Sequence, residues 1–494
     1  MSINCPNPID GFGFSEEEIA ETVERRGLLS MEIEFSQACN FRCPYCYNEE
    51  AFEAQELKPE EIDDVVIQAK ELGAKKIIIL GGEPMIYPEI RERIEFLREN
   101  DLTVEMFTNG TNMTPENARF MYEHDVAVVL KLNTFDRELQ NELTGCEKGY
   151  EIIHSALDNL QEAGYPSPAK RLAISTIICR QNIDELPDLW RWARQRGIEP
   201  YFEMITPQGR SIANEWLLAP ISEQKELFDE LSRIDREEFD HKWDPQPPLV
   251  GNRCLRHQFS CLVTSDGNVM PCVGVTIPIG NIREEPLEQI LDRSEVMEKL
   301  RHFSEYIREP CRSCERSGGC YGCRGSAYQL TGDFLAADPF CWHNEDKEIQ
   351  ALPRQVKPFL PHERPMLMVK ELVSAGERRG KVRATPLAED IFVNEDGVLD
   401  ETAYVELLAQ SIAAVHGFLQ NEEERKNHDG LLMSARNVEV SGLAHVGDTL
   451  EISVHKTVKM GDFGVVQGSI SKDGAEIANG QISIWQPSNG EKTI

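Results

Sequence analysis

The sequence predicts an α/β domain with a parallel sheet, then a cysteine-rich region with little core of its own, then an α+β domain. Three observations support this fold class. From residue 31 to about 206, apolar runs of strand length alternate with segments of helical period. Eight of the 14 cysteines lie between 254 and 341, and beyond 402 one apolar helix precedes β-patterned runs. A length of 494 residues, at roughly 150 per domain, also predicts about three domains.

The alternation in the first domain predicts six strands and five helices. The expected strands are 31–35, 76–80, 103–108, 127–132, 172–178 and 200–205. The expected helices are 59–72, 88–100, 115–124, 150–163 and 185–197, several with proline near the first turn and glycine after the last. Strands and helices that alternate form a parallel sheet with right-handed crossovers, either open or closed into a partial barrel. Its ligands sit at the carboxyl ends of the strands.

Four segments follow from this pattern. Residues 1–30 are a capping segment with one helix at 16–26, and 31–250 are the α/β domain, ending in a helix and a linker. Residues 251–349 have too little apolar periodicity for a core, so metal is expected to hold them. In 350–494 we expect a helix at 402–418 and then a meander of 434–440, 449–458, 464–471 and 475–485.

The net charge excludes several classes of partner. Lys and Arg total 51 and Asp and Glu 85, which gives −34 at pH 7. Such a surface repels nucleic acid and anionic lipid, so neither partner is expected. The longest apolar runs, such as 126–130, are far too short to span a membrane, and no signal-peptide pattern opens the chain. The expected location is the cytoplasm.

Cysteine usage indicates the chemistry. Fourteen cysteines in a cytoplasmic chain are poor candidates for disulfides, because that compartment keeps thiols reduced. Cys39, Cys43 and Cys46 follow the first expected strand with C-x3-C-x2-C spacing. Such a loop can fold three thiolates around an iron-sulfur cube and leave one iron open for a small ligand. The spacing alone also allows a structural zinc site with a distant fourth ligand.

The loop resembles the C-x3-C-x-aromatic-C signature of the radical S-adenosylmethionine (SAM) enzymes, with Tyr45 at the aromatic position. Gly81-Gly82-Glu83-Pro84 is similar to the family's GGEP motif, whose backbone meets the SAM amino group, and Thr108-Asn109-Gly110 ends the third strand, as is common there. The resemblance implies a partial (β/α)6 TIM-type barrel and a 4Fe-4S cluster on the three cysteines. It implies anaerobic oxidoreductase chemistry, in which an electron donor of flavodoxin or ferredoxin type drives SAM cleavage to a 5'-deoxyadenosyl radical.

The resemblance also indicates weaker candidates for SAM contacts. Lys131 and Asn133 at the fourth strand, and Ser175 or Arg180 at the fifth, are candidates for the SAM ribose and carboxylate. An ordinary strand-end role is the alternative for each of them. Asn182 and the segment 207–210 resemble parts of related enzymes that we expect to be structural supports.

Eight more cysteines satisfy two complete cages: Cys254, Cys261, Cys272, Cys311, Cys314, Cys320, Cys323 and Cys341. The run 311–323 alone would also fit a zinc knuckle. The whole pattern resembles the SPASM domain, except that its last internal spacing is two residues instead of three. The resemblance implies two auxiliary 4Fe-4S clusters, and so three in all. Cys254, Cys261, Cys272 and Cys323 would hold the inner one, and Cys311, Cys314, Cys320 and Cys341 the outer one. Fully ligated clusters carry electrons away from a substrate radical.

Val273, directly after Cys272, stands where sulfatase-maturing members of this group have an Asp that serves as general base. The resemblance to SPASM enzymes therefore does not extend to formylglycine formation.

The last domain resembles the hot-dog 3-hydroxyacyl-carrier-protein dehydratases in 360–367 (LPHERPML) and in the helix with Glu406 and Gln410. An unrelated small α+β domain is the alternative. Those dehydratases place a His opposite the helix Glu, but 390–400 contains none, so Glu406 is expected to lack its partner. His362 and His416 are expected in packed or surface roles. We therefore expect a binder of acyl chains or acyl carrier protein, or a dimerisation unit that forms a homodimer.

Two substrate classes stay open. The hot-dog resemblance favours an acyl group on a carrier protein, whereas most SPASM enzymes modify ribosomally made peptides. No leader-binding winged helix is recognisable before residue 31, which slightly favours the acyl substrate. A third hypothesis is an iron-sulfur protein that does not turn over SAM, and the intact 81–84 motif argues against it.

Overall fold

The computed structural model describes residues 13–48, 55–251, 253–317, 319–344, 354–375, 379–419, 430–460, 463–472 and 474–485. The chain divides into two compact units. The first unit comprises 1–329 with 334–349, and the second comprises 330–333 with 350–494.

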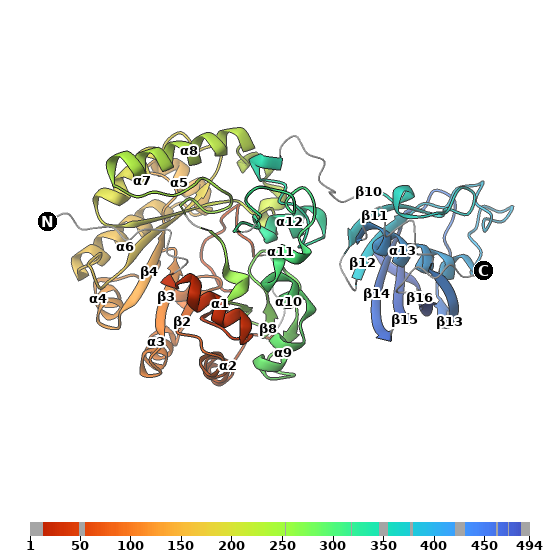
Figure 1. Cartoon of the computed structure of the whole chain (residues 1–494), viewed down its shortest axis with the longest axis horizontal. Helices are drawn as coiled ribbons and strands as arrows, with labels where there is room; N and C mark the ends of the chain where they lie inside the picture. Colours follow the sequence, from red (N-terminus) through yellow and green to blue (C-terminus); the bar gives the residue numbers. More distant parts are fainter. Residues whose placement is uncertain are drawn as a thin grey trace. The chain divides into compact units, whose positions relative to one another are not determined.

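A nine-stranded sheet forms the centre of the first unit, in the order β6-β5-β4-β3-β2-β1-β7-β8-β9 (Figure 1). Six strands run parallel in chain order: β1 (Ser30–Glu34), β2 (Lys76–Leu80), β3 (Thr103–Thr108), β4 (Val126–Lys131), β5 (Leu172–Ile178) and β6 (Glu199–Met204). The predicted parallel sheet is confirmed. β7 (Leu262–Val263) pairs parallel with β1, and β8 (Asn268–Met270) and β9 (Gly280–Asn281) continue antiparallel. The cysteine-rich region therefore extends the sheet of the α/β domain.

Helices connect the parallel strands. They are α2 (Pro59–Glu71), α3 (Ile90–Glu99), α4 (Pro115–Glu123), α5 (Arg137–Thr144), α6 (Gly149–Ala163) and α7 (Leu186–Gln195), and α8 (Ile221–Glu238) follows β6. In Figure 1, α2, α3, α4 and α6 lie outside the strands that they connect. The capping helix is α1 (Glu16–Glu24), and the cysteine-rich region adds α9 (Leu287–Arg293), α10 (Glu295–Arg301), α11 (Phe303–Tyr306) and α12 (Arg324–Thr331).

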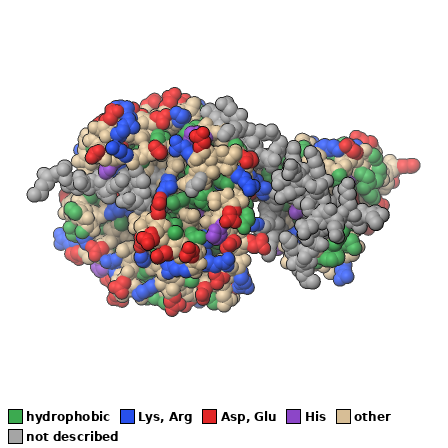
Figure 2. All heavy atoms as spheres, viewed as in Figure 1, with side chains coloured by type: hydrophobic (Ala, Val, Ile, Leu, Met, Phe, Trp, Pro, Cys, Tyr) green, Lys and Arg blue, Asp and Glu red, His purple; other side chains and the backbone are tan. Residues whose placement is uncertain are grey.

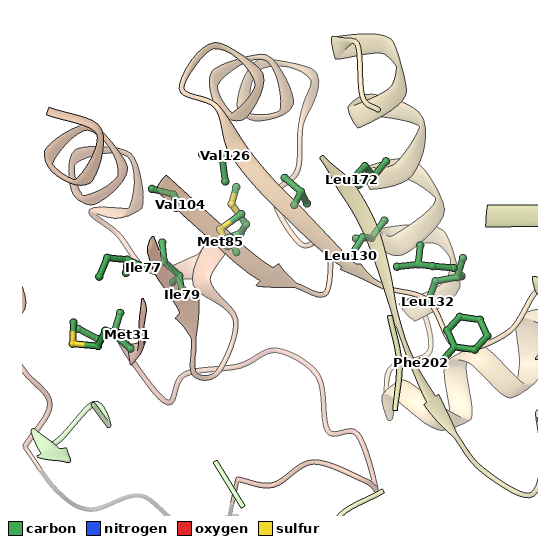
Figure 3. Packing of buried hydrophobic residues seen from close by; sticks show 14 of the residues in the cluster. Met31, Ile77, Ile79, Met85, Val104, Val126, Leu130, Leu132, Leu172 and Phe202 are labelled. Atoms are coloured by element: carbon green, nitrogen blue, oxygen red, sulfur yellow. The ribbon is translucent and has the colours of Figure 1, made fainter. Parts of the chain in front are cut away.

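One apolar core joins the strands of the first unit. Figure 3 shows side chains from successive strands, among them Ile77 and Ile79 of β2, Val104 of β3 and Leu130 of β4. All four are at most 1% exposed. The same core includes Val263 of β7, so residues of the cysteine-rich region complete it.

The second unit is an antiparallel sheet with one long helix. Its strands are β10 (Arg354–Gln355), β11 (Val369–Ala375), β12 (Arg379–Ala384), β13 (Leu431–Val440), β14 (Leu450–Met460), β15 (Phe463–Lys472) and β16 (Ala475–Trp485). α13 (Ala403–Leu419) packs on β11, β12 and β14, and its Leu407 shares a buried core with Val382 and Val466.

The predicted meander is wrong in its order. The sheet runs β10-β11-β12-β14-β15-β16-β13, so the first strand after the helix pairs with the last one. The reason is that β11 and β12, which the sequence analysis did not predict, precede the helix, and β12 occupies the place beside β14.

Charged side chains cover the exterior. On the face drawn in Figure 2, acidic and basic groups are interspersed over the first unit. Within the described ranges, no helix is both long and apolar enough to cross a membrane.

Candidate functional site

A cavity of about 270 Å³ brings the sequence motifs of the first domain together. Its wall includes Cys39, Cys43 and Cys46 from the loop after β1, Gly81, Gly82 and Glu83 from the loop after β2, and Thr108 and Asn109 at the end of β3. These loops meet because the carboxyl ends of neighbouring parallel strands share one edge of the sheet. Tyr45, Lys131, Ser175 and Val273 also line the cavity.

The three thiols of the loop face this cavity and are partly buried. The Phe41 amide donates to Cys39 Sγ at 3.4 Å, and Asn109 Nδ2 lies 3.9 Å from the same sulfur. Burial raises the pKa of Cys43 to about 12, so binding of a metal centre there must displace a proton. Three thiols on one wall with amide donors to sulfur fit an iron-sulfur cluster, whose sulfurs accept such hydrogen bonds.

The GGEP loop rests directly on the backbone of the cysteine loop. The amides of Gly82 and Glu83 donate to the carbonyls of Ser36 and Ala38, both at 2.8 Å. A Cβ on Gly82 would lie 1.9 Å from the Ala38 carbonyl oxygen, so only glycine allows this approach.

The Glu83 carboxylate ties the GGEP loop to the end of β3. It accepts hydrogen bonds from Thr108 Oγ1 and the Asn109 amide, each at 2.6 Å, and from the Met85 amide at 2.9 Å. Burial raises its pKa to about 7. Because its oxygens are occupied in this way, Glu83 acts here as a structural tie.

The weaker candidates divide into two groups. Lys131 and Ser175 line the cavity and are joined by a 3.2 Å hydrogen bond. Asn133 lies behind the wall, where its amide donates to the Tyr45 hydroxyl at 2.9 Å. Arg180 does not line the cavity, and its guanidinium donates to the Leu218 carbonyl at 3.2 Å.

Asn182 and the segment 207–210, which were expected to be structural supports, hydrogen-bond to the backbone around the site. The buried Asn182 side chain bonds the backbone of Asn133, Ile177 and Cys179. In the segment 207–210, the Arg210 amide donates to the Cys46 carbonyl at 2.9 Å.

Sequence reasoning missed three charged groups that line the cavity: Glu32 of β1, Glu203 of β6 and Arg256 of the short helix Arg256–Gln258. Arg256 donates to Glu32 at 2.5 Å and lies 3.4 Å from the Tyr201 hydroxyl. Glu203 of β6 also lines the cavity, and its carboxylate makes no hydrogen bond or ion pair with the described residues. Burial raises the pKa of Glu203, while the charges of Lys131 and Arg256 oppose that shift. The signal that could have revealed Glu32 and Glu203 was the presence of carboxylates inside otherwise apolar strand runs.

Six of the eight later cysteines have other cysteines of this set as neighbours. Burial raises the pKa of Cys272 to about 12, and the nearby Cys254 raises it further. Desolvation also raises the pKa of the partly buried Cys323, with smaller contributions from Asp338 and Cys254. Burial likewise raises the pKa of Cys341 to about 12, with further contributions from Cys320 and Cys311. These neighbours are compatible with the expected inner and outer cages, whose assignment, with Cys261 and Cys314 included, stays a prediction.

Amide donors also reach these sulfurs, with N–S distances of 3.4 Å for Val275 to Cys272, 3.3 Å for Ser326 to Cys323 and 3.4 Å for Gly322 to Cys320. Thr206 Oγ1, after β6, lies 3.9 Å from Cys323 Sγ. In the part of the chain that the structure describes, no three His, Cys, Asp or Glu side chains are close enough to hold a single metal ion.

The second unit corrects one expectation about Glu406. His362 Nε2 lies 3.9 Å from Glu406 Oε1, so Glu406 does have a histidine neighbour, supplied by the loop before β11 instead of by 390–400. Gln410 Nε2 donates to Glu406 Oε1 at 2.7 Å and to the Met366 carbonyl at 2.7 Å, which fixes the carboxylate beside this loop. His362 Nδ1 is buried without a hydrogen-bond partner in the described chain.

Comparisons with known proteins assign three segments to families. Residues 33–193 match the radical SAM superfamily, 254–315 match SPASM, an iron-sulfur cluster-binding domain, and 354–494 match the ApeP-like family, described as ApeP dehydratase. The chain therefore carries a radical SAM domain, a SPASM domain and an ApeP-like dehydratase domain. The family resemblances drawn from its motifs are confirmed.

The relatives of the first two domains are named as enzymes. The AdoMet-dependent heme synthase of Methanosarcina barkeri is 25% identical over 64% of this chain and 96% of its own length. The PqqA peptide cyclase of Streptomyces rochei is 29% identical over 63% of this chain and 88% of its own. Streptococcus suis SuiB, solved with its precursor peptide SuiA, is 16% identical with a TM-score of 0.51 over 66% of this chain and 79% of its own, a likeness that shows the fold alone. General radical SAM chemistry is thus supported.

Proposed function

We propose that the chain is a radical SAM/SPASM oxidoreductase that oxidises an oxygen-bearing carbon of an acyl group held on an acyl carrier protein. The fused ApeP-like dehydratase domain carries this proposal, because an acyl-processing domain in the same chain favours an acyl substrate over a peptide. The lining of the cavity supports it, since Glu203, Lys131 and Tyr201 offer polar contacts to a hydroxyl or carbonyl group.

The residues that would hold the cofactors are those that the motifs indicate. Cys39, Cys43 and Cys46 fit a 4Fe-4S cluster with SAM, and the two later cages fit auxiliary clusters. When bound, these groups supply the 5'-deoxyadenosyl radical that takes a hydrogen atom from substrate carbon, and they accept the electron that the substrate radical then loses. The backbone of the GGEP loop would orient SAM.

Glu203 would act as proton acceptor in this oxidation. A carbon radical that bears a hydroxyl group becomes a carbonyl when it loses one electron and the hydroxyl proton. Val273 cannot take that proton, although it lines the same cavity. The Glu203 carboxylate can, because it faces the cavity without a bonded partner among the described residues and because Lys131 and Arg256 favour its charged form.

The test is 5'-deoxyadenosine release by anaerobically reconstituted enzyme with dithionite and SAM. The substrates compared are 3-hydroxyacyl carrier protein, free acyl-CoA and a peptide mixture. We expect strong stimulation by the carrier-bound acyl group only. Stimulation by peptide alone would favour a peptide maturase, and a colourless protein that contains zinc would contradict cluster chemistry altogether. Loss of the Cys39 loop with unchanged function would indicate an iron-sulfur protein without SAM turnover.

A second activity, dehydration of the 3-hydroxyacyl group, is favoured by the pairing of His362 with Glu406. The two side chains are 32% and 22% exposed, so substrate can reach them. His362 would remove the proton next to the thioester, Glu406 would protonate the leaving hydroxyl, and the products would be an enoyl thioester and water. Mass spectrometry of the carrier protein measures this loss of water. We expect His362→Asn and Glu406→Gln to abolish it and His445→Asn, an exposed control, to leave it unchanged.

We also propose that the dehydratase-like domain forms a homodimer through β13. This edge strand exposes Leu431, Leu432 and Met433 by 50%, 42% and 56%, and apolar sheet edges favour pairing. Light scattering should give twice the 56.1 kDa mass of the chain, and Met433→Lys should shift the protein toward monomer.

A further inference from the structure

A basic cleft in the first unit lies apart from the reaction cavity. It encloses about 660 Å³ and is lined by Arg236, Lys242, Arg253 and Arg316. Asp244 is the one carboxylate among the described residues of its wall. Four cations against one anion are a marked local excess in a chain of net charge −34, so this cleft attracts anions although the chain as a whole is acidic.

Two of the four cations are already partly neutralised. Arg253 pairs with Glu16 at 2.7 Å, and Arg236 lies 3.5 Å from Glu237. Lys242 and Arg316 are exposed and form no ion pair with the described residues. The cleft therefore keeps positive charge that an incoming partner can neutralise.

The cleft also reaches one of the cysteine cages. Cys320 forms part of its wall, and the spacing of the later cysteines assigns Cys320 to the proposed outer cage with Cys311, Cys314 and Cys341. A protein bound in the cleft is thus held beside the outer cage, whereas the reaction cavity is lined by other residues.

We propose that this cleft is the docking surface for an acidic electron-carrier protein of the flavodoxin type. The proposal rests on the proposed function in one respect, namely that the outer cysteines hold an auxiliary cluster. Through that cluster the docked carrier would take up the one electron that the substrate radical loses, and in its reduced form it would supply the one electron that SAM cleavage consumes. Charge complementarity selects an acidic protein, and the position of Cys320 selects a redox protein over an acyl carrier protein, which would need access to the reaction cavity. Attraction of this kind raises association rates and weakens at high salt.

The test compares two double variants of the full-length, anaerobically reconstituted protein. Lys242→Glu/Arg316→Glu reverses the two cations without ion pairs. Arg119→Glu/Lys148→Glu reverses two exposed cations that do not line the cleft. Each reversal changes the charge by two, so both pairs shift the chain from −34 to −38 and repel an acidic protein equally at long range. Iron content and circular dichroism confirm that the variants fold and hold their clusters.

The first readout is the Kd for oxidised flavodoxin, measured by calorimetry at low and at high salt. We expect the cleft variant to bind about tenfold or more weakly and to lose most of its salt dependence, while the control variant keeps wild-type affinity. Equal affinities in the two variants would overturn the proposal. So would weakened binding of acyl carrier protein with unchanged flavodoxin binding, because the cleft would then belong to the substrate's carrier.

The second readout separates this proposal from the proposed function. Turnover driven by dithionite needs no protein partner, so it should be equal in all three proteins, whereas flavodoxin-driven turnover should fall only in the cleft variant. No turnover with dithionite in any of them would contradict the proposed function and leave the binding result to decide on the cleft.

Discussion

Replacing Gly82 with alanine should separate the two loops that build the SAM site. The added Cβ would lie 1.9 Å from the Ala38 carbonyl oxygen, whereas ordinary contact begins at 3.4 Å, so the loops must part by about 1.5 Å. That movement breaks the 2.8 Å hydrogen bonds from Gly82 to Ser36 and from Glu83 to Ala38. Two backbone hydrogen bonds at about 1 kcal/mol each, with about 1–3 kcal/mol of overpacking, give about 3–5 kcal/mol. The Kd for SAM should therefore rise more than about a hundredfold.

The assay is equilibrium binding of SAM to anaerobically reconstituted protein, with iron analysis of the same sample. Because the eight later cysteines belong to the two other proposed clusters, Gly82→Ala should lose at most about one third of the iron, the share of one cluster in three. Gly430→Ala is the matched control, since its backbone is not in the left-handed region and the nearest atom to an added Cβ, the Trp485 carbonyl oxygen, would be 3.9 Å away. Wild-type SAM affinity and full iron content in Gly82→Ala would refute the reasoning that the two loops must touch.

Three further predictions follow from buried charges. Glu203→Gln should lower the oxidised product about a hundredfold while 5'-deoxyadenosine release stays near wild type; an equal fall of both in a product assay would show that Glu203 only shapes the cavity. Burial raises the pKa of Glu34 and Glu83 from 4.5 to about 7, so the folded state keeps protons that the unfolded chain releases. Their contribution to the free energy of unfolding therefore falls as pH rises from about 4.5 to 7 and is constant above pH 7. In urea titrations of cluster-free protein, the free energy of unfolding of Glu83→Gln should fall less steeply over this pH range than that of the wild type. Arg194 and Asp235 pair at 2.7 Å with both side chains 0% exposed, so Arg194→Met should cost about 3–5 kcal/mol in urea unfolding. Arg191→Met, which breaks the partly exposed pair with Glu238, should cost less than about 1 kcal/mol, and equal costs in the two variants would contradict an origin in burial.

Local patterns predicted much of the first unit. β2, β3 and β5 begin and end where their apolar runs do, because strands buried on both faces read as continuous apolar segments. α5 was not predicted, since its buried residues are Gln140, Leu143 and Thr144, which show no apolar stripe. Gln140 is buried because its side chain is hydrogen-bonded: Oε1 accepts hydrogen bonds from the amides of Asn133 and Thr134.

The second unit shows the limit of local patterns. Strand pairing there depends on which segments precede the helix, and a run of β residues does not reveal its neighbour. β13 could pair with either β14 or β16 by composition, and the position of β12 decides between them. The partial (β/α)6 barrel and the hot-dog arrangement remain predictions.

Some residues of the candidate sites could likewise be predicted from local patterns and others could not. The loops could be predicted because their chemistry lies in contiguous motifs, such as 81–84. His362 and Glu406 come together across 44 positions, and no spacing rule links them. The basic cleft likewise draws Arg236 from α8, Lys242 from the following loop and Arg316 from the cysteine-rich region.

The pairing of β7 with β1 also affects how the protein is made. The outer edge of β1 has a partner only after Leu262 and Val263 have left the ribosome, because these residues pair with Glu32 and Ile33. Until then a nascent chain exposes the unpaired backbone edge of β1, which invites pairing with other chains. A fragment that ends at residue 250 should therefore aggregate instead of folding.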